Sequence, residues 1–496
     1  MSNSTAIRHS AYRRFGSMPA SDIRSAAAEI SGQIGADHVH TGDTVRQRYP
    51  GDQSWLTMIH AHHGKPLNQP DIVAVPGTTA EVADIIRMAA RLKIAITPLG
   101  GGSGVQGAAN ANCGGLQIDL TRLDRIREID TASMTCTVEA GKNVMTFESE
   151  LNERGLSFTH YPASAEWATV GGSVAARGSG VLSTRYGNIQ DHVLSLEVVL
   201  PDGSVVDLPP VPKHGVGPEM TQLFVGAEGT LGLVTAIRVK IRKLPVSRRF
   251  SVFRFPSLTE GIEAGRVIMT SGLRPAVMRL YDHDAATQSL ERAVQAGLDG
   301  ETMVLMVDGD HDRLIELEAV LCDEICVAHG GQALPAEIGR TWWDRRYVFY
   351  HPPHAPQLPQ IWCTMDAVSD FGRINALYKE VTRAMRESIE PRWGLTLKTH
   401  LSHWFDWGAM IYPRFNVPRG PDDLDEALVL HDRIVTAAVE GALRAGGVIN
   451  DHHGVGMRLA PHLEAQFGAG GMKLLRGIKN GIDPHHLLCP GKLAMS

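Results

Sequence analysis

The sequence has little of what marks several common classes of protein. It contains only six cysteines in 496 residues, and no two of them are separated by just two residues. Scattered cysteines of this kind indicate a reducing compartment and argue against a structural zinc site. No apolar run approaches the length of about 20 residues that a membrane-spanning helix needs, so we expect no membrane span.

An excess of positive charge is also missing. The formal net charge is −6 at pH 7, which does not indicate a nucleic-acid-binding surface. The N-terminal stretch carries Arg8, Arg13 and Arg14 but lacks the apolar core of a signal peptide. We therefore expect a cytoplasmic protein, with a transit peptide as the alternative. Its length predicts two or three domains.

Glycine, in contrast, is abundant and grouped. Residues 97–104 read TPLGGGSG and follow a short apolar run, residues 94–96. Such a loop exposes backbone N–H groups that suit a phosphate or pyrophosphate. Gly102, Gly104 and Gly107 match the spacing of the dinucleotide fingerprint, but no helix is expected after them, and no Lys-Ser/Thr pair indicates a Walker loop. A plain flexible loop is the alternative interpretation.

Two further glycine-rich blocks favour a ligand. Residues 161–180 contain Gly171-Gly172 and Gly178-Ser179-Gly180, and residues 226–232 read GAEGTLG. Each block lies beside sequence with a strand-like pattern. Three such loops predict an extended small-molecule ligand that crosses one domain.

The hydrophobic pattern predicts an α+β fold. The first half shows a helix over 20–34, strands over 72–75, 116–120, 134–139 and 194–200, and a hairpin turn at Asp202-Gly203. Thr78 and Glu81 form a capping-box pair before a helical apolar face. After Pro245, the pattern predicts strands over 250–255, 276–281 and 303–307 and helices over 312–328, 373–388 and 424–445. Short strands mixed with helices in this way argue against a doubly wound sheet.

Three polar clusters are candidates for catalysis. Residues 450–456 read NDHHGVG, and His452 or His453 could accept a proton near neutral pH, although a turn with exposed histidines is the alternative. Arg279 stands among apolar neighbours on a predicted strand, where it needs an anionic partner, either a ligand or a structural acidic residue. Residues 399–412 are rich in aromatic residues, which form either core or a pocket wall.

The three glycine-rich blocks, in this order, resemble the FAD domain of the vanillyl-alcohol oxidase and p-cresol methylhydroxylase (PCMH) superfamily. The resemblance implies a two-lobed PCMH-type FAD-binding domain and an α+β cap domain. The implied domains are an N-terminal arm (1–65), the FAD-binding domain (66–245), the cap (246–445) and a C-terminal segment that returns to the FAD domain (446–496). The implied cofactor-binding residues are Pro98, Gly100, Gly101, Gly102, Ser103, Gly104, Pro162, Ser164, Thr169, Gly172, Ser173, Ala176, Ser179, Asn188, Ile189, Glu228, Gly232 and Val234.

Within the superfamily, the sequence resembles the alkylglycerone-phosphate synthases most. His452-His453-Gly454 is similar to their histidine loop and to the Glu-His-Gly loop of the D-lactate and glycolate dehydrogenases. The resemblance implies that Tyr412, His452, His453 and Arg279 are catalytic. The sequence departs from the synthases where Asp451 replaces a histidine, where Ala163 replaces an acidic residue, and at residues 350–354, which lack the cap arginine.

We therefore expect an FAD-dependent oxidoreductase that oxidises a hydroxyl-bearing small molecule, a 2-hydroxy acid or an aromatic alcohol, by hydride transfer to flavin N5. The alternative enzymatic function is alkyl transfer without net redox. The non-enzymatic alternative is a flavin-binding scaffold without turnover. FAD is expected to be non-covalent, because the first loop has no histidine beside its glycines and residues 163–169 contain no cysteine. A homodimer is also expected.

Two further expectations concern the substrate pocket. A set of aromatic residues is predicted to line it. Arg345 and Arg346 are candidates for additional anion contacts, but a solvated pair of charges is the favoured interpretation for them. This aromatic set is Trp342, Trp343, Tyr347, Phe349, Trp404 and Trp407. No metal is expected, although His400, His403 and His452 resemble the metal ligands of D-2-hydroxyacid dehydrogenases, because the Gly-Asp-Gly-Asn block of that site is missing.

Overall fold

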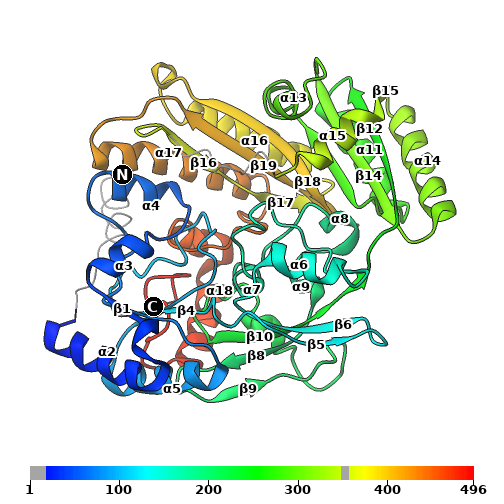
Figure 1. Ribbon diagram of the computed structural model, residues 1–496. Helices are drawn as coiled ribbons and strands as arrows, with labels where there is room; N and C mark the ends of the chain where they lie inside the picture. Colours follow the sequence, from blue (N-terminus) through cyan, green and yellow to red (C-terminus); the bar gives the residue numbers. More distant parts are fainter. Residues whose placement is uncertain (1–17, 348–356, 496) are drawn as a thin grey trace.

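The structure is a computed structural model and describes residues 18–347 and 357–495. Its strands form an eight-stranded sheet in one part of the molecule, and sheets of four, five and two strands in the other (Figure 1). Most neighbouring strands are antiparallel and helices are interspersed among them, which gives the α+β class that the sequence predicts. Among the described residues, no helix is both long and apolar enough to cross a membrane.

The four-stranded sheet has the order β1-β2-β4-β3, and helices α2 and α5 pack on it. Helix α5 starts as the capping pair predicts, because the Thr78 hydroxyl accepts a hydrogen bond from the Glu81 N–H. Its predicted apolar face is buried against the sheet. The elements are α2 (Ala20–Ile34), β1 (Val39–Thr41), α3 (Asp43–Arg48), α4 (Trp55–His62), β2 (Ile72–Ala74), α5 (Thr79–Leu92), β3 (Ile96–Leu99) and β4 (Leu116–Asp119).

The five-stranded sheet has the order β5-β6-β10-β8-β9 and is antiparallel throughout. The predicted hairpin at Asp202-Gly203 is confirmed as the connection between β8 and β9. Strands β7 and β11 form the separate two-stranded sheet. The elements of this part of the chain are β5 (Ile126–Asp130), β6 (Thr135–Glu139), α6 (Val144–Asn152), β7 (Leu156–Ser157), α7 (Val170–Ala176), α8 (Ser183–Tyr186), α9 (Ile189–His192), β8 (Val193–Val199), β9 (Val205–Asp207), α10 (Thr221–Phe224), β10 (Leu233–Lys240) and β11 (Arg242–Lys243).

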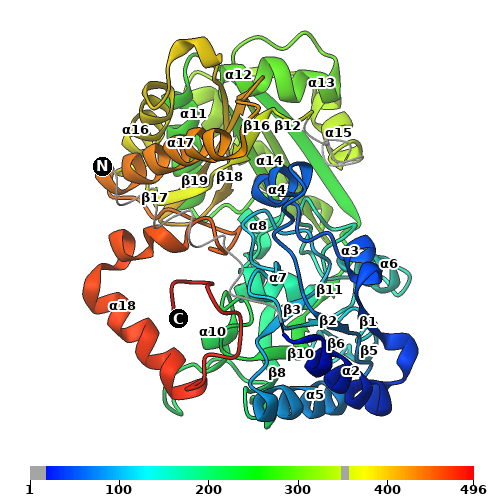
Figure 2. The same ribbon diagram turned by 90° about the vertical axis from the view of Figure 1, so that its left-hand side faces the viewer.

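The eight-stranded sheet has the order β15-β12-β14-β13-β18-β19-β16, and β17 also pairs with β19. Helices α11, α14, α16 and α17 cover one face of it (Figures 1 and 2). Its elements are β12 (Ser247–Phe255), α11 (Leu258–Thr270), β13 (Val277–Tyr281), α12 (His283–Ala285), α13 (Glu291–Val294), β14 (Glu301–Gly309), α14 (Asp312–Ala328), β15 (Gln332–Leu334), α15 (Ala336–Asp344), β16 (Ile361–Thr364), β17 (Ala367–Asp370), α16 (Ile374–Glu387), β18 (Thr396–Trp404), β19 (Gly408–Val417) and α17 (Leu424–Arg444).

The alternation of side chains along β13 separates the two faces of this sheet. Met278 and Leu280 belong to the core beneath the helices, whereas Arg279 and Tyr281 line a cavity on the opposite face. The sheet therefore presents a polar and aromatic surface to the other part of the molecule.

The C-terminal segment connects the two parts. Val448 pairs with Val368 of β17, and farther along the chain Leu488 pairs with Ile96 of β3. Between these points lie the histidine loop and α18 (Leu463–Ile482), which runs beside the smaller sheets in Figure 2. This course places His452 and His453 between the glycine-rich loops and the eight-stranded sheet.

Candidate active site

The first glycine-rich loop packs directly against the second. A Cβ atom on Gly101 would lie 1.6 Å from the carbonyl oxygen of Trp167, and one on Gly100 would lie 2.4 Å from the Thr169 hydroxyl. At Gly102 and Gly104, by contrast, the nearest protein atoms would be 3.6 and 3.7 Å away. Gly100 and Gly101 are therefore required for the close packing of the two loops, whereas a Cβ at Gly102 or Gly104 would make only ordinary van der Waals contacts.

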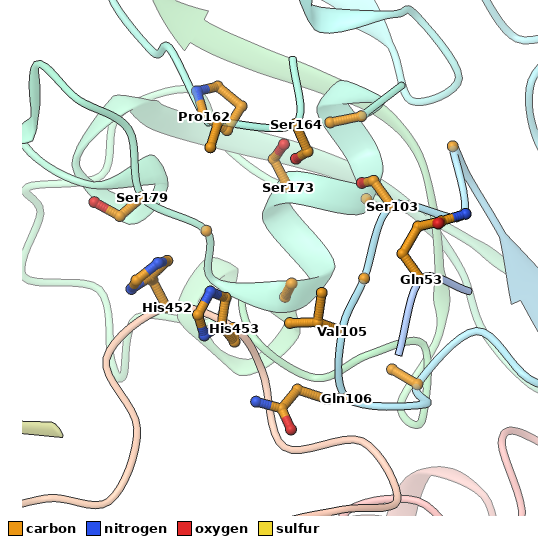
Figure 3. Close-up of a pocket in the computed structure, with 18 of the residues that line it drawn as sticks. Gln53, Ser103, Val105, Gln106, Pro162, Ser164, Ser173, Ser179, His452 and His453 are labelled. Carbon is orange, nitrogen blue, oxygen red and sulfur yellow. The ribbon is translucent and has the colours of Figure 1, made fainter. Parts of the chain in front are cut away.

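All three glycine-rich loops open onto one cavity of about 450 Å³. Figure 3 shows Ser103, Pro162, Ser164 and Ser173 around it, with His452 and His453 on a separate loop. The predicted cofactor-binding residues that line the cavity are Pro98, Gly100, Gly101, Gly102, Ser103, Gly104, Pro162, Ser164, Thr169, Gly172, Ser173, Ala176, Ser179, Glu228, Gly232 and Val234.

Asn188 and Ile189 do not line the cavity, contrary to the sequence-based expectation. The Asn188 side chain accepts a 2.6 Å hydrogen bond from the Ser179 hydroxyl, and Ile189 is fully buried in the core behind the wall. Their role is indirect, because they hold the Gly178–Gly180 turn that does line the cavity.

The residues around the cavity fit FAD. Glycines of the first loop and at the start of α7 line the cavity, so backbone rather than side chains faces a ligand there. The buried Nε2 atom of Gln106, which also lines the cavity, has no hydrogen-bond partner among the described residues. Because buried amide groups are almost always hydrogen-bonded, this atom indicates a polar ligand.

Gly101→Ala is expected to reduce the FAD content of the purified protein to near zero, because the added methyl group would push the first loop away from Trp167. The ratio of flavin to protein absorbance measures this content, and circular dichroism checks the fold. Gly32→Ala is the matched control, since nothing lies within 4 Å of the added atom in α2. Wild-type flavin content in Gly101→Ala would contradict the prediction.

Asp366, in the turn between β16 and β17, organises the histidine loop. Its Oδ2 atom accepts hydrogen bonds from the backbone N–H groups of Asp451, His452 and His453 at 2.9, 2.7 and 3.3 Å. Its Oδ1 atom lies 2.7 Å from His453 Nδ1. Burial alone raises the pKa of this carboxyl, but the neighbouring histidines and hydrogen bonds outweigh burial and lower it to about 2.

The ionised Asp366 determines the tautomer of His453. A carboxylate only accepts hydrogen bonds, so Nδ1 of His453 carries the proton and Nε2 is an acceptor. Nε2 lies 3.3 Å from the Tyr412 hydroxyl, which donates to it. Burial lowers the pKa of His453, and Asp366 offsets only part of that effect. The imidazole is therefore neutral near pH 7, with Nε2 available as a base.

Arg279, His400 and Tyr412 lie side by side on three adjacent strands. His400 is paired with Tyr281 of β13 and with Tyr412 of β19, and its ring stacks on Tyr412 at 4.7 Å. His400 Nε2 accepts a 2.8 Å hydrogen bond from Arg279. Burial and the charge of Arg279 lower the pKa of His400 well below its usual value, so this imidazole is neutral.

A second carboxylate, Asp451, contacts two further histidines. Its Oδ2 atom lies 2.6 Å from His403 Nδ1 and 3.0 Å from His452 Nδ1. His403, Asp451 and His452 are close enough together to hold a metal ion, as are Asp366, His452 and His453, whereas His400 belongs to neither group. His400, His403 and His452, the metal set that the sequence raised and argued against, do not form one such group. The expected absence of a metal stays a prediction, which metal analysis of the purified protein tests.

Glu228 connects the third glycine-rich block to the histidine loop. Its carboxylate accepts hydrogen bonds from the backbone N–H groups of Val455 and Gly456, at 2.5 and 2.9 Å. Burial raises the pKa of Glu228 to about 7 despite these bonds. This carboxyl fixes the position of the loop that carries His452 and His453.

The predicted aromatic pocket is wrong in most of its members. Trp342 and Trp404 are buried in hydrophobic cores, Trp407 is 53% exposed, and Phe349 lies outside the described residues. Trp343 and Tyr347, with Arg346, line a separate cavity. The aromatic residues that do line the main cavity are Trp167, Phe224, Tyr281, Trp362 and Tyr412.

Three polar residues that sequence reasoning missed also belong to the site. Asp366 gives no local signal, because it is a single acidic residue in a strand connection. Lys398 and Arg414 do give one, since Lys398, His400 and Ser402 alternate with apolar or small residues, and Arg414 follows Tyr412 by two. That period of two predicts a shared strand face. Residues 350–354, where the cap arginine was sought, lie outside the described residues.

The comparisons with known proteins agree with this geometry. A family described as FAD binding domain matches residues 70–209, and one described as FAD linked oxidases, C-terminal domain, matches residues 244–493. Alkyldihydroxyacetonephosphate synthase of Trypanosoma brucei brucei is 28% identical, over 94% of this chain and 80% of its own length. Mitochondrial D-lactate dehydrogenase [cytochrome] of Arabidopsis thaliana is 27% identical, over 87% and 76%.

The fold is shared with a solved structure of p-cresol methylhydroxylase with substrate bound. That structure has a TM-score of 0.78 at 16% identity, and the match covers 98% of this chain and 99% of that one. The architecture is therefore the PCMH type, with an FAD-binding domain and an α+β cap.

Proposed function

The chain belongs to the FAD-linked oxidases, and we propose that it oxidises the hydroxyl group of a small 2-hydroxy acid. FAD, when bound, accepts a hydride at N5. The observation that carries the proposal is the arrangement of Asp366, His453 and Tyr412, which forms a continuous hydrogen-bonded path that ends in the cavity.

His453 is proposed as the base. The proton of the substrate hydroxyl passes to Nε2 of His453, either directly or through the Tyr412 hydroxyl, which already donates to that atom. The imidazolium that results is stabilised by Asp366 at 2.7 Å from Nδ1. His452 lies beside His453, with ring centroids 4.2 Å apart, and we propose that its ring shapes the wall of the cavity next to the base.

Arg279 is proposed to bind the substrate carboxylate. Its guanidinium contacts His400, whose ring stacks on Tyr412. Because Tyr412 contacts His453, a carboxylate bound to Arg279 would lie near the proposed base. An arginine presents several donors in a planar arrangement that matches a carboxylate. The positive charge of Arg279 on the cavity wall argues for a hydroxy acid over an aromatic alcohol.

A second candidate function is alkyl transfer without net redox. The relative from Trypanosoma brucei brucei is named as a synthase of this kind, and Arg279, Tyr412 and the histidine loop resemble the corresponding residues of that family. Tyr412 and Arg279 would serve either reaction, because both need a proton acceptor and an anion site.

The test is anaerobic mixing of the flavin-loaded protein with 2-hydroxy acids, aromatic alcohols, and an acyl-glycerone phosphate with a fatty alcohol. We expect 2-hydroxy acids to bleach the flavin absorbance. Admission of air then separates an oxidase, which reoxidises rapidly, from a dehydrogenase. Alkyl exchange without bleaching would establish the synthase reaction instead, and no response to any compound would favour a scaffold without turnover.

Three other expectations remain predictions. The flavin is proposed to be non-covalent, and acid precipitation should then release the yellow colour into solution. A cytoplasmic location and a homodimer were expected from the sequence. Light scattering of the purified flavin-loaded protein measures the number of chains directly.

A further inference from the structure

Two cations face each other at one end of the cavity. Lys398 of β18 and Arg414 of β19 are directly paired across the antiparallel strands, and both line the cavity. Directly opposed side chains in such a pair have Cβ atoms only about 5 Å apart, and like charges at this position destabilise a sheet. The fold therefore maintains a repulsive pair on the face that meets the ligand.

Among the described residues, no acidic side chain forms an ion pair with Lys398 or Arg414. Within residues 18–347 and 357–495, neither Lys398 nor Arg414 forms an ion pair or a side-chain hydrogen bond. Burial lowers the pKa of Lys398, and the positive charges of Arg292 of α13 and of Arg414 lower it further, whereas Asp284 and Asp282 oppose this only in part. Unneutralised cations on a cavity wall favour an anionic ligand.

The position of the pair relative to Arg279 is set by the strand register. Arg279 contacts His400, and Lys398 lies two residues from His400 on the same face of β18. Two residues of an antiparallel strand span about 7 Å. The paired residues His400 and Tyr412 lie between Arg279 and the Lys398–Arg414 pair. Tyr412 contacts His453, the proposed base.

We propose that Lys398 and Arg414 form a second anion subsite, which selects hydroxy acids that carry another anionic group at the end opposite their reacting hydroxyl. Arg279 holds the carboxylate beside the hydroxyl, and Lys398 with Arg414 holds a distal carboxylate or phosphate. This inference rests on the proposed function for the reaction, but the anion subsite itself depends only on the residues that line the cavity.

The test compares substrates that differ only at the distal end. 2-Hydroxypentanoate and 2-hydroxypentanedioate have the same carbon chain and differ by one carboxylate, and 3-phospho-2-hydroxypropanoate supplies a phosphate in its place. With wild-type protein, we expect at least one dianion to have a KM about 10- to 100-fold lower than 2-hydroxypentanoate, as charged hydrogen bonds would give. The preferred dianion identifies which distal group the site takes.

Lys398→Met and Arg414→Met, singly and together, should raise the KM of the preferred dianion toward that of 2-hydroxypentanoate and so remove this preference. Arg419→Met is the matched control, because Arg419 follows β19, pairs with Asp422 and is not among the residues that line the cavity. Since the two cations repel, Lys398→Met should also leave unchanged or slightly raise the melting temperature of the substrate-free holoprotein. If Lys398 served only to stabilise the fold, Lys398→Met would lower the melting temperature.

Binding of glutarate, which has no hydroxyl to oxidise, separates the two proposals. Calorimetry on the holoprotein should detect glutarate with wild-type protein and Arg419→Met, but not with the double variant. If glutarate binds in this way and no hydroxy acid bleaches the flavin, the subsite stands and the proposed reaction fails. Equal KM values for the monoanion and every dianion, or glutarate binding that survives in the double variant, would overturn the subsite.

Discussion

His453→Asn is expected to lower the rate of flavin reduction by substrate about 10²- to 10⁴-fold, the usual contribution of a positioned general base. Asparagine keeps the backbone N–H that donates to Asp366 but has no ring nitrogen facing Tyr412. Anaerobic stopped-flow measurement of flavin bleaching gives the rate, and the flavin spectrum of the variant verifies that FAD is still bound. His485→Asn, at an exposed position, is the control.

The pH dependence should identify the same residue. Because the pKa of His453 lies below its usual 6.5, Nε2 is unprotonated through neutral pH and becomes protonated only as the pH falls below that value. We expect kcat/KM to be constant near neutrality and to decline at lower pH, and His453→Asn to lose this decline. Tyr412→Phe keeps the ring stacked on His400 and should reduce the rate less. A wild-type rate in His453→Asn with FAD bound would remove His453 from the mechanism.

Asp366→Asn is expected to lower the same rate about 10³- to 10⁴-fold, although Asp366 itself does not line the cavity. The amide has one acceptor oxygen and one NH₂ group, which cannot replace a carboxylate that receives Nδ1–H and three backbone N–H groups. If the NH₂ group faces Nδ1, the proton moves to Nε2, and His453 can no longer accept one. Steady-state and stopped-flow rates measure the loss.

The pH profile separates this positioning role from general damage to the fold. Asp366 raises the pKa of His453, so its removal should move the decline of kcat/KM to still lower pH. Asp370→Asn is the matched control on the adjacent strand, where the carboxylate is exposed and pairs with Arg373. An unchanged profile together with an unchanged rate in Asp366→Asn would show that Asp366 does not act through His453.

The local structure could be predicted because its causes are local. The capping pair at Thr78 and Glu81 starts α5, and the helix over 20–34 has the predicted bounds. The three glycine-rich blocks indicated backbone ligation of a phosphorylated cofactor, and their residues surround one cavity. In each case, neighbouring residues determine the backbone conformation or the face of an element.

The position of Trp404 could not be predicted, because a strand irregularity decides which side chains of β18 face the cavity. The pairing of β18 with β19 shifts register between Leu401 and Trp404. A bulge of this kind places the consecutive residues Ser402 and His403 at the cavity and turns Trp404 into the core beneath the helices. Composition alone could not place this bulge.

By itself, the sequence determined the α+β class and the glycine-rich loops that line the cofactor cavity, because glycine backbones and apolar periodicity are properties of short segments. The resemblance to a family added Arg279, Tyr412, His452 and His453, which all line the cavity. Only the tertiary structure decided that Asp366 orients His453 across 87 residues, that Arg279 reaches His400 across 121, and that Lys398 faces Arg414. The physical reason is strand register: which distant side chains meet depends on how strands pair and where they bulge, and no short segment carries that information.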